Sequence, residues 1–271
     1  MPAPNEITVS QLNRLIGTPT CPEIIDICIE GDFAADPFLI PGARRHPHTD
    51  VPGLIQSLTS DRVVIVCQKG LKLSQGLASR LRSDAIRADY LQGGVYAWRD
   101  DADTLRYPFA ALPPQTDGAT LWVTRHRPKV DRIACPWLIR RFIDRDARFL
   151  FVSPSEVGNV AEKYNATPFD TADVALSHHG DRCSFDAISD AFNLTSPALT
   201  RMADVIRAAD TNRHDLHPAA AGLLALSVGL SRQYRDDHDQ LKAGLPLYDA
   251  LYRWARDGYD ETHQSPKPRS A

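Results

Sequence analysis

Residues 62–74 read Arg-Val-Val-Ile-Val-Cys-Gln-Lys-Gly-Leu-Lys-Leu-Ser, and Cys67 lies near the centre of this stretch. The residues before Cys67 are mostly apolar and β-branched, which is typical of a buried strand. Leu73, Leu77 and Leu81 follow at the spacing of one apolar helix face. The stretch therefore predicts a strand that ends at Cys67, a short loop, and a helix.

The same alternation continues on both sides of this stretch. Residues 23–29 form a second apolar, β-branched run, and residues 51–58 read as a short helix between the two strands. Another short strand signal, at residues 90–91, follows the helix expected over 73–82. Strands that alternate with helices predict an α/β fold, with a mostly parallel sheet covered by helices on both faces.

A change in composition marks the boundary between two parts of the chain. Residues 112–119 contain two prolines and a glycine and have no apolar periodicity, which is typical of a linker. The chain of 271 residues has the length of two domains. We expect a first domain over 1–112, a linker over 113–119, a second domain over 120–262 and a flexible tail over 263–271.

The second domain begins with strand signals and ends with helix signals. Apolar runs predict strands at 121–124, 148–152 and 174–178, and residues 132–144 predict a helix that bends or restarts at Pro136. Wide apolar stripes predict further helices at 185–193, 197–212, 218–230 and 232–257. We therefore expect an α+β domain with a mostly helical C-terminal half.

Charge and cysteine content exclude several classes of protein. The 31 basic and 34 acidic residues give a formal net charge of −3, which argues against a chain-wide nucleic-acid-binding surface. No apolar run is long enough to cross a membrane and the N-terminus lacks the features of a secretory signal, so we expect a cytoplasmic protein. The 5 cysteines are odd in number and none are spaced as Cys-x-x-Cys, which predicts individual thiols.

The loop that begins at Cys67 has the features of an anion-binding site. A loop between a strand and a helix can turn successive backbone N–H groups inward, and the helix adds the positive end of its dipole. Lys69 and Lys72 add full charges. Together these features favour a nucleophilic thiolate at Cys67, and the same loop would hold a persulfide or a small oxyanion. The alternative is a buried, inert cysteine at a strand end.

Four segments of the first domain resemble the rhodanese family of sulfurtransferases. They are the strand end Ile24-Ile-Asp-Ile, the turn Ile40-Pro-Gly-Ala, the six-residue loop Cys67–Lys72, and the closing stretch Leu91-Gln-Gly-Gly-Val-Tyr-Ala-Trp. The resemblance implies that Cys67 carries a persulfide, in an anion-binding loop of Gln68, Lys69, Gly70, Leu71 and Lys72 with Asp26 in a supporting role. It also implies a small sulfur donor, a thiol acceptor and no cofactor for sulfur transfer.

The chain departs from the family pattern at several positions. Cys28 and Gln68 stand where the family has arginines, and Leu39 stands where it has a histidine. Fewer arginines weaken the binding of an anionic donor such as thiosulfate. Leu73 stands where the related phosphatase loop has its phosphate-binding arginine, which disfavours phosphatase chemistry. Cys28 is also a candidate to form a resolving disulfide with Cys67, and its alternative is a buried strand cysteine.

Basic residues are concentrated at the start of the second domain. Residues 125–148 contain 8 basic and 3 acidic side chains. This local positive charge suits an oxyanion or a nucleic-acid backbone, and Arg125, Lys129 and Arg132 are the oxyanion candidates. The alternative is a solvated helix face.

A second cluster of polar side chains contains metal-ligand types. His178, His179, Asp181 and Cys183 fall within six residues, and Asp210 follows farther along the chain. Imidazole, carboxylate and thiolate groups suit a transition metal such as zinc or iron. However, adjacent residues of a strand point to opposite faces, so His178 and His179 share an ion only if the chain turns at Gly180. The alternative is a purely structural role for these groups.

Most of the second domain resembles the C-terminal domain of ChrB-type chromate-resistance proteins. The resemblance is carried by residues 122–142, by Leu176-Ser-His-His-Gly-Asp-Arg-Cys-Ser-Phe, by Ala209-Asp-Thr and by Ala220-Ala-Gly-Leu-Leu. It implies a role in chromate resistance or its regulation, with chromate as a candidate ligand.

Two functional hypotheses follow from the sequence. In the first, the protein is a persulfide sulfurtransferase linked to chromate or oxidative-stress resistance, with a metal or oxyanion site in its second domain. In the second, it is a chromate-responsive sensor or transcriptional regulator whose first domain senses redox state or anions without turnover. We favour the enzyme, because the second domain has no net basic charge to bind DNA.

Overall fold

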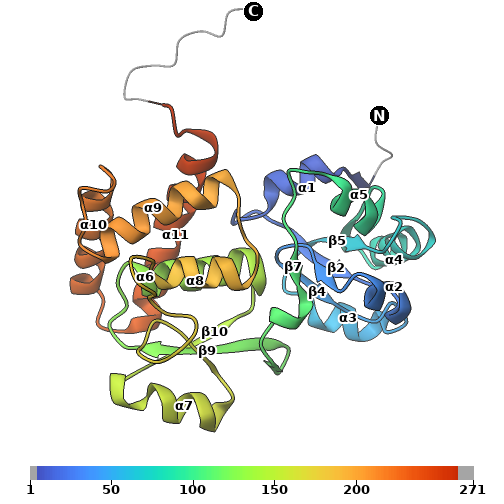
Figure 1. Ribbon diagram of the computed structural model, residues 1–271. Coiled ribbons are helices and arrows are strands. Elements are labelled where there is room, and N and C mark those ends of the chain that lie inside the picture. The colour runs from blue at the N-terminus through green and yellow to red at the C-terminus, as the bar shows by residue number, and fades with distance from the viewer. Residues whose placement is uncertain (1–4, 262–271) are drawn as a thin grey trace, which may run out of the picture.

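A five-stranded parallel sheet forms the centre of the first lobe (Figure 1). The computed structural model describes residues 5–261, so the tail expected over 263–271 lies outside the described residues. The strands lie in the order β1 (Glu6–Ile7), β6 (Arg87–Leu91), β5 (Arg62–Val66), β2 (Glu23–Asp26) and β4 (Ala43–Arg45). The expected parallel α/β architecture of the first domain is confirmed.

Helices cover both faces of this sheet because its buried strands alternate their side chains between two cores. On one face, Ile25, Ile65 and Cys67 pack against helices α3 and α4. On the other face, Ile24, Val64 and Val66 belong to the core that includes α1 and α5. The helices of this lobe are α1 (Val9–Leu15), α2 (Glu30–Ala35), α3 (Val51–Ser57), α4 (Lys72–Ser83) and α5 (Gly94–Asp100).

The second lobe begins with a small mixed sheet. Strand β9 (Ala119–Arg125) lies between β10 (Arg148–Val152) and β11 (Thr167–Pro168), to which it runs parallel. The stretch expected to be a linker contains β8 (Gln115–Thr116), which turns back antiparallel onto β9. A small antiparallel pair, β3 (Phe38–Leu39) and β7 (Tyr107–Pro108), precedes it in the first lobe.

The strand expected at residues 174–178 is a loop in the structure. Asp170 and Asp173 adopt left-handed backbone angles, with φ of +47° and +60°. Such residues turn the chain and interrupt an extended strand. The short strand β11 takes the place beside β9 instead.

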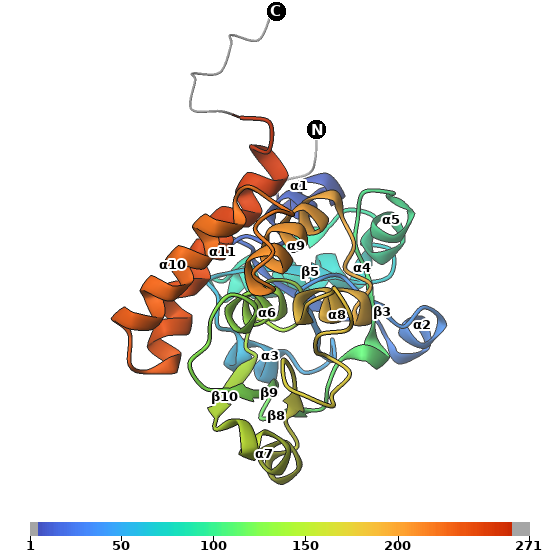
Figure 2. The ribbon, with the colours of Figure 1, turned by 60° about the vertical axis from the view of Figure 1, so that its left-hand side comes forward.

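Helices dominate the rest of the second lobe, as expected (Figure 2). Helix α6 ends at Leu138 and continues as a wider π-helical turn, Ile139–Ile143, close to the bend expected at Pro136, which lacks a backbone N–H. The helices are α6 (Asp131–Leu138), α7 (Val157–Tyr164), α8 (Ser184–Ala191), α9 (Pro197–Asp210), α10 (Ala220–Gln233) and α11 (Asp237–Asp257).

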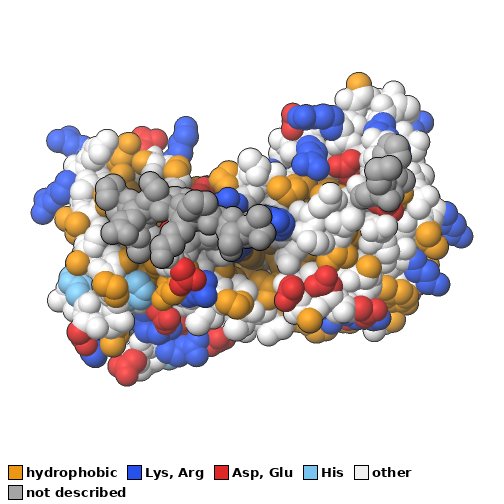
Figure 3. All heavy atoms as spheres, turned by 90° about the horizontal axis from the view of Figure 1, so that it is seen from above, with side chains coloured by type: hydrophobic (Ala, Val, Ile, Leu, Met, Phe, Trp, Pro, Cys, Tyr) orange, Lys and Arg blue, Asp and Glu red, His pale blue; other side chains and the backbone are white. Residues whose placement is uncertain are grey.

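The two lobes share one continuous apolar core. The Gly42 N–H donates to the carbonyl of Phe142 at 2.8 Å, and the Tyr107 hydroxyl donates to that of Ile143 at 3.1 Å. Seen from above, the surface between the lobes is hollowed (Figure 3). Among the described residues, no helix combines the length and apolar character needed to cross a bilayer.

Candidate functional site

Cys67 lies directly after β5, at the point where the chain turns toward α4. Its side chain is 5 % exposed, and its Sγ donates to the Ser74 Oγ at 3.2 Å. Ser74 belongs to the first turn of α4 and also bonds to the carbonyl of Leu71. The thiol is therefore held at the N-terminal end of a 12-residue helix, where the helix dipole favours negative charge.

The glycine pair at residues 93–94 holds the Cys67 loop in shape. The N–H groups of Val95 and Tyr96 donate to the carbonyls of Cys67 and Gln68, at 3.0 and 3.1 Å. Gly94 has a φ of +61°, and a Cβ there would collide with the Cys67 carbonyl. Gly70 has a φ of +66°, and a Cβ there would lie 2.5 Å from the Leu91 carbonyl. The loop and the glycine turn pack backbone against backbone, which only glycine permits.

The rest of the loop is available to an anion. Within residues 5–261, the backbone N–H groups of residues 68–71 donate to no protein acceptor. Lys69 and Lys72 are exposed, and neither forms an ion pair in the described part of the chain. Unbonded amides and free ammonium groups next to a thiol are the features of an anion-binding loop. The positions predicted for this loop, Gln68, Lys69, Gly70, Leu71 and Lys72, are thus adjacent to Cys67 in space.

Asp26 and Cys28 end the strand next to the Cys67 strand, because Asp26 pairs with Val66. The buried carboxylate of Asp26 accepts the N–H of Cys28 at 2.8 Å, and burial raises the pKa of Asp26 despite this bond. Burial also raises the pKa of Cys28. Cys28 and Cys67 belong to cores on opposite faces of the sheet, and both are free thiols. The charge of Cys67 is among the causes that raise the pKa of Cys28, so the two thiols lie near each other and the resolving disulfide stays a prediction.

A cluster of carboxylates surrounds one histidine in the second lobe. The Nε2 of His178 lies 3.1 Å from Asp210 Oδ2, 3.3 Å from Asp170 Oδ1 and 3.6 Å from Asp131 Oδ2. Asp131 begins α6, Asp210 ends α9, and Asp170 and His178 lie in the connection between β11 and α8. Four residues from three segments that are distant in sequence thus meet at one point, which we call the Asp–His cluster.

Neighbouring groups fix the two most buried carboxylates of this cluster. Asp131 accepts the backbone N–H groups of Ser184 and Phe185, at 2.6 and 3.0 Å, at the N-terminus of α8. The Cys135 Sγ donates to the same carboxylate at 3.3 Å. Asp170 accepts the Ser184 hydroxyl at 2.9 Å. These contacts set the direction in which each carboxylate presents its remaining lone pairs.

Burial and mutual proximity shift the pKa values within the Asp–His cluster. Burial, followed by the charges of Asp210 and Asp170, raises the pKa of Asp131 to about 7. Hydrogen bonds to Asp170 and Asp210 raise the pKa of His178 to about 10. Burial alone would raise the pKa of Asp170, but the hydrogen bond from His178 and the nearby Arg132 and Arg125 lower it overall.

Three of the residues predicted as metal ligands lie apart from the Asp–His cluster. The chain turns at Gly180, whose φ is +59°, and His179 and Asp181 face solvent. The His179 Nε2 pairs with the carbonyl of Ala175 at 2.8 Å. Cys183 is fully buried, caps α8, and has its pKa raised by burial. Of the predicted set, the structure brings together His178 and Asp210.

Asp131 and Asp170 are the cluster residues that the sequence reasoning missed. Asp131 lies in the basic stretch, where it reads as an ordinary acidic residue in a first helical turn. Asp170 follows the short strand β11. The one local signal is that Asp131 precedes a nearly continuous apolar run over residues 133–139.

The predicted oxyanion residues have other partners in the structure. Arg125 and Arg132 both contact the Asp170 carboxylate, each at 3.1 Å, and Lys129 is exposed. Other arginines of the basic stretch are also used internally: Arg127 donates to the Tyr234 carbonyl, and Arg141 pairs with Asp249 at 2.8 Å. Three of the eight basic side chains of this stretch thus form ion pairs within the described residues, and Arg127 donates to backbone carbonyls.

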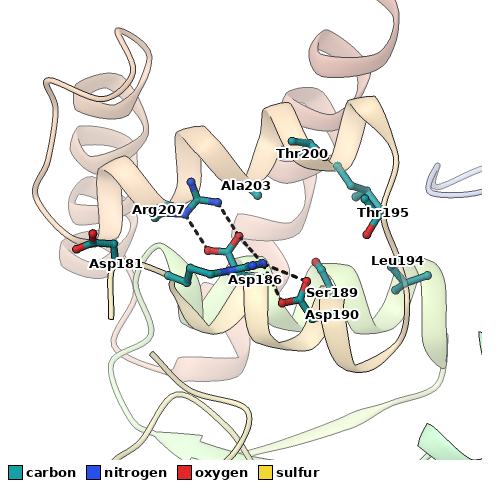
Figure 4. A pocket seen from close by; sticks show the side chains of 11 residues that line it. Asp181, Asp186, Ser189, Asp190, Leu194, Thr195, Thr200, Ala203 and Arg207 are labelled. Atoms are coloured by element: carbon teal, nitrogen blue, oxygen red, sulfur yellow. Dashed lines mark hydrogen bonds and ion pairs between the residues drawn. The ribbon is translucent and has the colours of Figure 1, made fainter. Parts of the chain in front are cut away.

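A cleft of about 470 Å³ lies between α8 and α9 (Figure 4). Four of its five charged side chains form ion pairs with one another, and the fifth is Asp181. Arg207 contacts Asp186 at 2.8 Å, and Arg182 contacts Asp190 at 2.9 Å. Because these ion pairs neutralise the charges of Arg182 and Arg207, we expect the cleft to bind a charged ligand only weakly.

Comparison with known proteins found similar sequences for the second lobe and similar solved structures for the first. Residues 122–255 match the family model of the ChrB C-terminal domain. Protein ChrB of Cupriavidus metallidurans is 33 % identical over 141 residues, which cover 52 % of this chain and 42 % of that protein. The chain thus matches less than half the length of this curated relative.

The first lobe is similar to solved rhodanese-like structures. A rhodanese-like domain protein from Staphylococcus aureus is 26 % identical, with a TM-score of 0.32, over 36 % of this chain and 95 % of that one. A thiosulfate sulfurtransferase from Pseudomonas aeruginosa is 21 % identical, with a TM-score of 0.33, over 40 % of this chain and 20 % of that one. The comparisons thus found similarity to rhodanese-like structures in the first lobe and to the ChrB C-terminal domain over residues 122–255.

Proposed function

We propose that the protein is a cysteine-persulfide sulfurtransferase that acts in chromate or oxidative-stress resistance. The observation that supports this proposal most strongly is the Cys67 loop, where a thiol lies at a helix N-terminus. The four backbone N–H groups that follow it have no acceptor in the described part of the protein. Lys69 and Lys72 add positive charge to this loop that no ion pair among residues 5–261 neutralises. Such a loop stabilises an anionic sulfur, either as the attacking thiolate or as the terminal sulfur of a persulfide.

The proposed reaction consists of two nucleophilic displacements. The Cys67 thiolate attacks the sulfane sulfur of a donor, an S–S bond forms at Cys67, and the donor leaves with the electron pair of its broken bond to sulfur. An acceptor thiolate then attacks the terminal sulfur of the persulfide. The Cys67 thiolate leaves with its electron pair, so no net oxidation occurs and no cofactor is needed.

The link to chromate rests on the similarity of the second domain to ChrB. The five cysteines are all free, which suits a reducing cytoplasm. Chromate is an oxidant of thiols, so a sulfur-transfer activity that supplies persulfides would serve a cell exposed to it. A small sulfur donor and a thiol acceptor are the proposed substrates.

Persulfide formation on the purified full chain tests the proposal. We expect mass spectrometry to detect one added sulfur on the Cys67 peptide after treatment with an alkyl persulfide or thiosulfate, and transfer of that sulfur to a small thiol. The Cys67→Ala variant should lose transfer, and the matched Cys28→Ala variant should keep it. Full activity in Cys67→Ala would overturn the proposal.

The alternative is a chromate-responsive regulator that uses residues 125–148 on DNA. Arg125, Arg132 and Arg141 weigh against it, because guanidinium groups held in ion pairs are not free to contact phosphates. On the face seen in Figure 3, acidic and basic side chains are also interspersed. A DNA affinity that falls steeply with salt and persists in Cys67→Ala would favour the regulator.

A further inference from the structure

We propose that Asp131, Asp170 and His178 bind a divalent transition-metal ion in the second lobe. One ligand atom from each residue lies within 4.8 Å of the other two, so a single ion can contact all three. Asp210 lies beside them, with its Oδ2 at 3.1 Å from the His178 Nε2. This site is separate from the Cys67 loop, and the proposal does not depend on sulfur transfer.

The arrangement of carboxylates around His178 Nε2 supports a metal site on geometric grounds. Three carboxylates face this nitrogen at 3.1 to 3.6 Å, although one N–H can satisfy only one or two acceptors well. In the metal-free protein the nitrogen must carry a proton, because all its partners are acceptors. A metal ion placed among the same atoms would use the Nε2 lone pair and the carboxylate oxygens together, and that proton would be released.

An independent feature of the site is the set of groups that hold its ligands from behind. The α8 amides and the Cys135 thiol hold Asp131, and the Ser184 hydroxyl, Arg125 and Arg132 hold Asp170. Metal ligands in proteins are characteristically oriented by such outer contacts. Here these contacts leave carboxylate oxygens of both residues turned toward His178.

Exposure shows how an ion would enter. The side chains of Asp131 and Asp170 are 1 % and 4 % exposed, whereas that of His178 is 37 % exposed. The site is thus closed on the carboxylate side and open on the histidine side.

The donor atoms select the class of ion. Two or three carboxylates and one imidazole suit Mn²⁺, Fe²⁺ or Zn²⁺. Both nearby thiols are otherwise engaged: Cys135 donates to Asp131, and Cys183 caps α8. The site therefore lacks the exposed sulfur ligands that a soft ion such as Cu⁺ prefers.

Calorimetric titration of chelator-treated, untagged full-length protein with Mn²⁺ and with Zn²⁺ tests the site. We expect one ion per chain, with protons released in proportion when buffers of different ionisation enthalpy are compared. His178→Ala and Asp170→Asn should each weaken binding at least tenfold. The matched control is His179→Ala, which removes an exposed imidazole outside the cluster and should leave affinity unchanged.

Two further measurements make every outcome decisive. Circular dichroism of each variant shows whether it is folded. If Asp170→Asn does not fold, His178→Ala remains as the test, because His178 is exposed. Cys67→Ala should bind metal like the parent chain, which separates this proposal from sulfur transfer. Absence of saturable binding to the parent, or equal affinity in folded His178→Ala, would overturn the metal site.

Discussion

The two lobes build their polar sites in opposite ways. The Cys67 loop comes from one continuous stretch of chain at a strand–helix junction, and the glycine pair at residues 93–94 fixes its shape. The Asp–His cluster comes from three segments between residues 131 and 210, and its members are fixed by side-chain and cap contacts. A local site depends on backbone conformation, whereas a dispersed site depends on the packing of several helices.

The largest effect is expected from a change in the backbone of the glycine pair that shapes the Cys67 loop. Gly94→Ala places a Cβ against the Cys67 carbonyl and the Gly70 nitrogen, at a φ of +61° that disfavours L side chains. We expect the free energy of unfolding to fall by more than about 3 kcal/mol and sulfur transfer to be lost. The matched control is Gly76→Ala in α4, where a Cβ meets nothing within 4 Å. Urea denaturation should show Gly76→Ala to be as stable as the parent or more so; equal stability of the two variants would show that the loop does not need its glycines.

The next prediction concerns the packing of helices in the second lobe, where an ion pair connects α8 to α9. Arg207 forms two hydrogen bonds to the buried carboxylate of Asp186, which also accepts the Cys183 N–H. Asp186→Ala leaves Arg207 without this partner, and we expect a loss of about 2–3 kcal/mol in urea denaturation, less than for a fully buried pair because Arg207 is partly exposed. Burial opposes ionisation of Asp186, but Arg207 lowers its pKa overall. This stabilisation is therefore present above the ordinary carboxyl pKa and is lost as the pH falls through the lowered one. An unchanged acid transition in Asp186→Ala would contradict this assignment.

The same contrast explains which features could be predicted from the sequence. β5 and α4 match their predicted positions within one residue, because their apolar patterns are local. The strand expected at 174–178 was wrong, since left-handed Asp170 and Asp173 turn the chain there. His178 and Asp210 could be singled out by residue type. Asp131 could not, because it is brought to the site only by the packing of α6 against α8 and α9.

A smaller effect is expected from the pH dependence of the metal-free Asp–His cluster. His178 faces Asp131, Asp170 and Asp210, and Arg125 and Arg132 lie behind Asp170. The pKa of His178 rises from its ordinary 6.5 to about 10 in the fold. A raised histidine pKa stabilises the fold fully below pH 6.5, and this contribution disappears as the pH rises toward 10. Because the side chain is partly exposed, we expect no more than about 1 kcal/mol.

Thermal unfolding of chelator-treated protein across this pH range measures the effect. His178→Gln should remove the part of the pH dependence between 6.5 and 10, while His179→Gln should retain it. Identical profiles for His178→Gln and the parent would show that the histidine charge does not stabilise the cluster.

The smallest expected effect concerns the two lysines of the Cys67 loop. Lys69 and Lys72 are exposed and unpaired within residues 5–261, so their replacement leaves packing intact and should change stability by less than about 0.5 kcal/mol. Each charge attracts an anionic donor across solvent, where salt screens it. Lys69→Ala and Lys72→Ala should therefore raise KM for thiosulfate about two- to fivefold at low ionic strength and leave kcat for a neutral sulfur donor unchanged. Since screened charges lose their influence, the difference from the parent should vanish at high salt. A kcat defect that persists there would mean that the lysines act on the reacting sulfur itself, as the backbone amides of the loop do in our proposal.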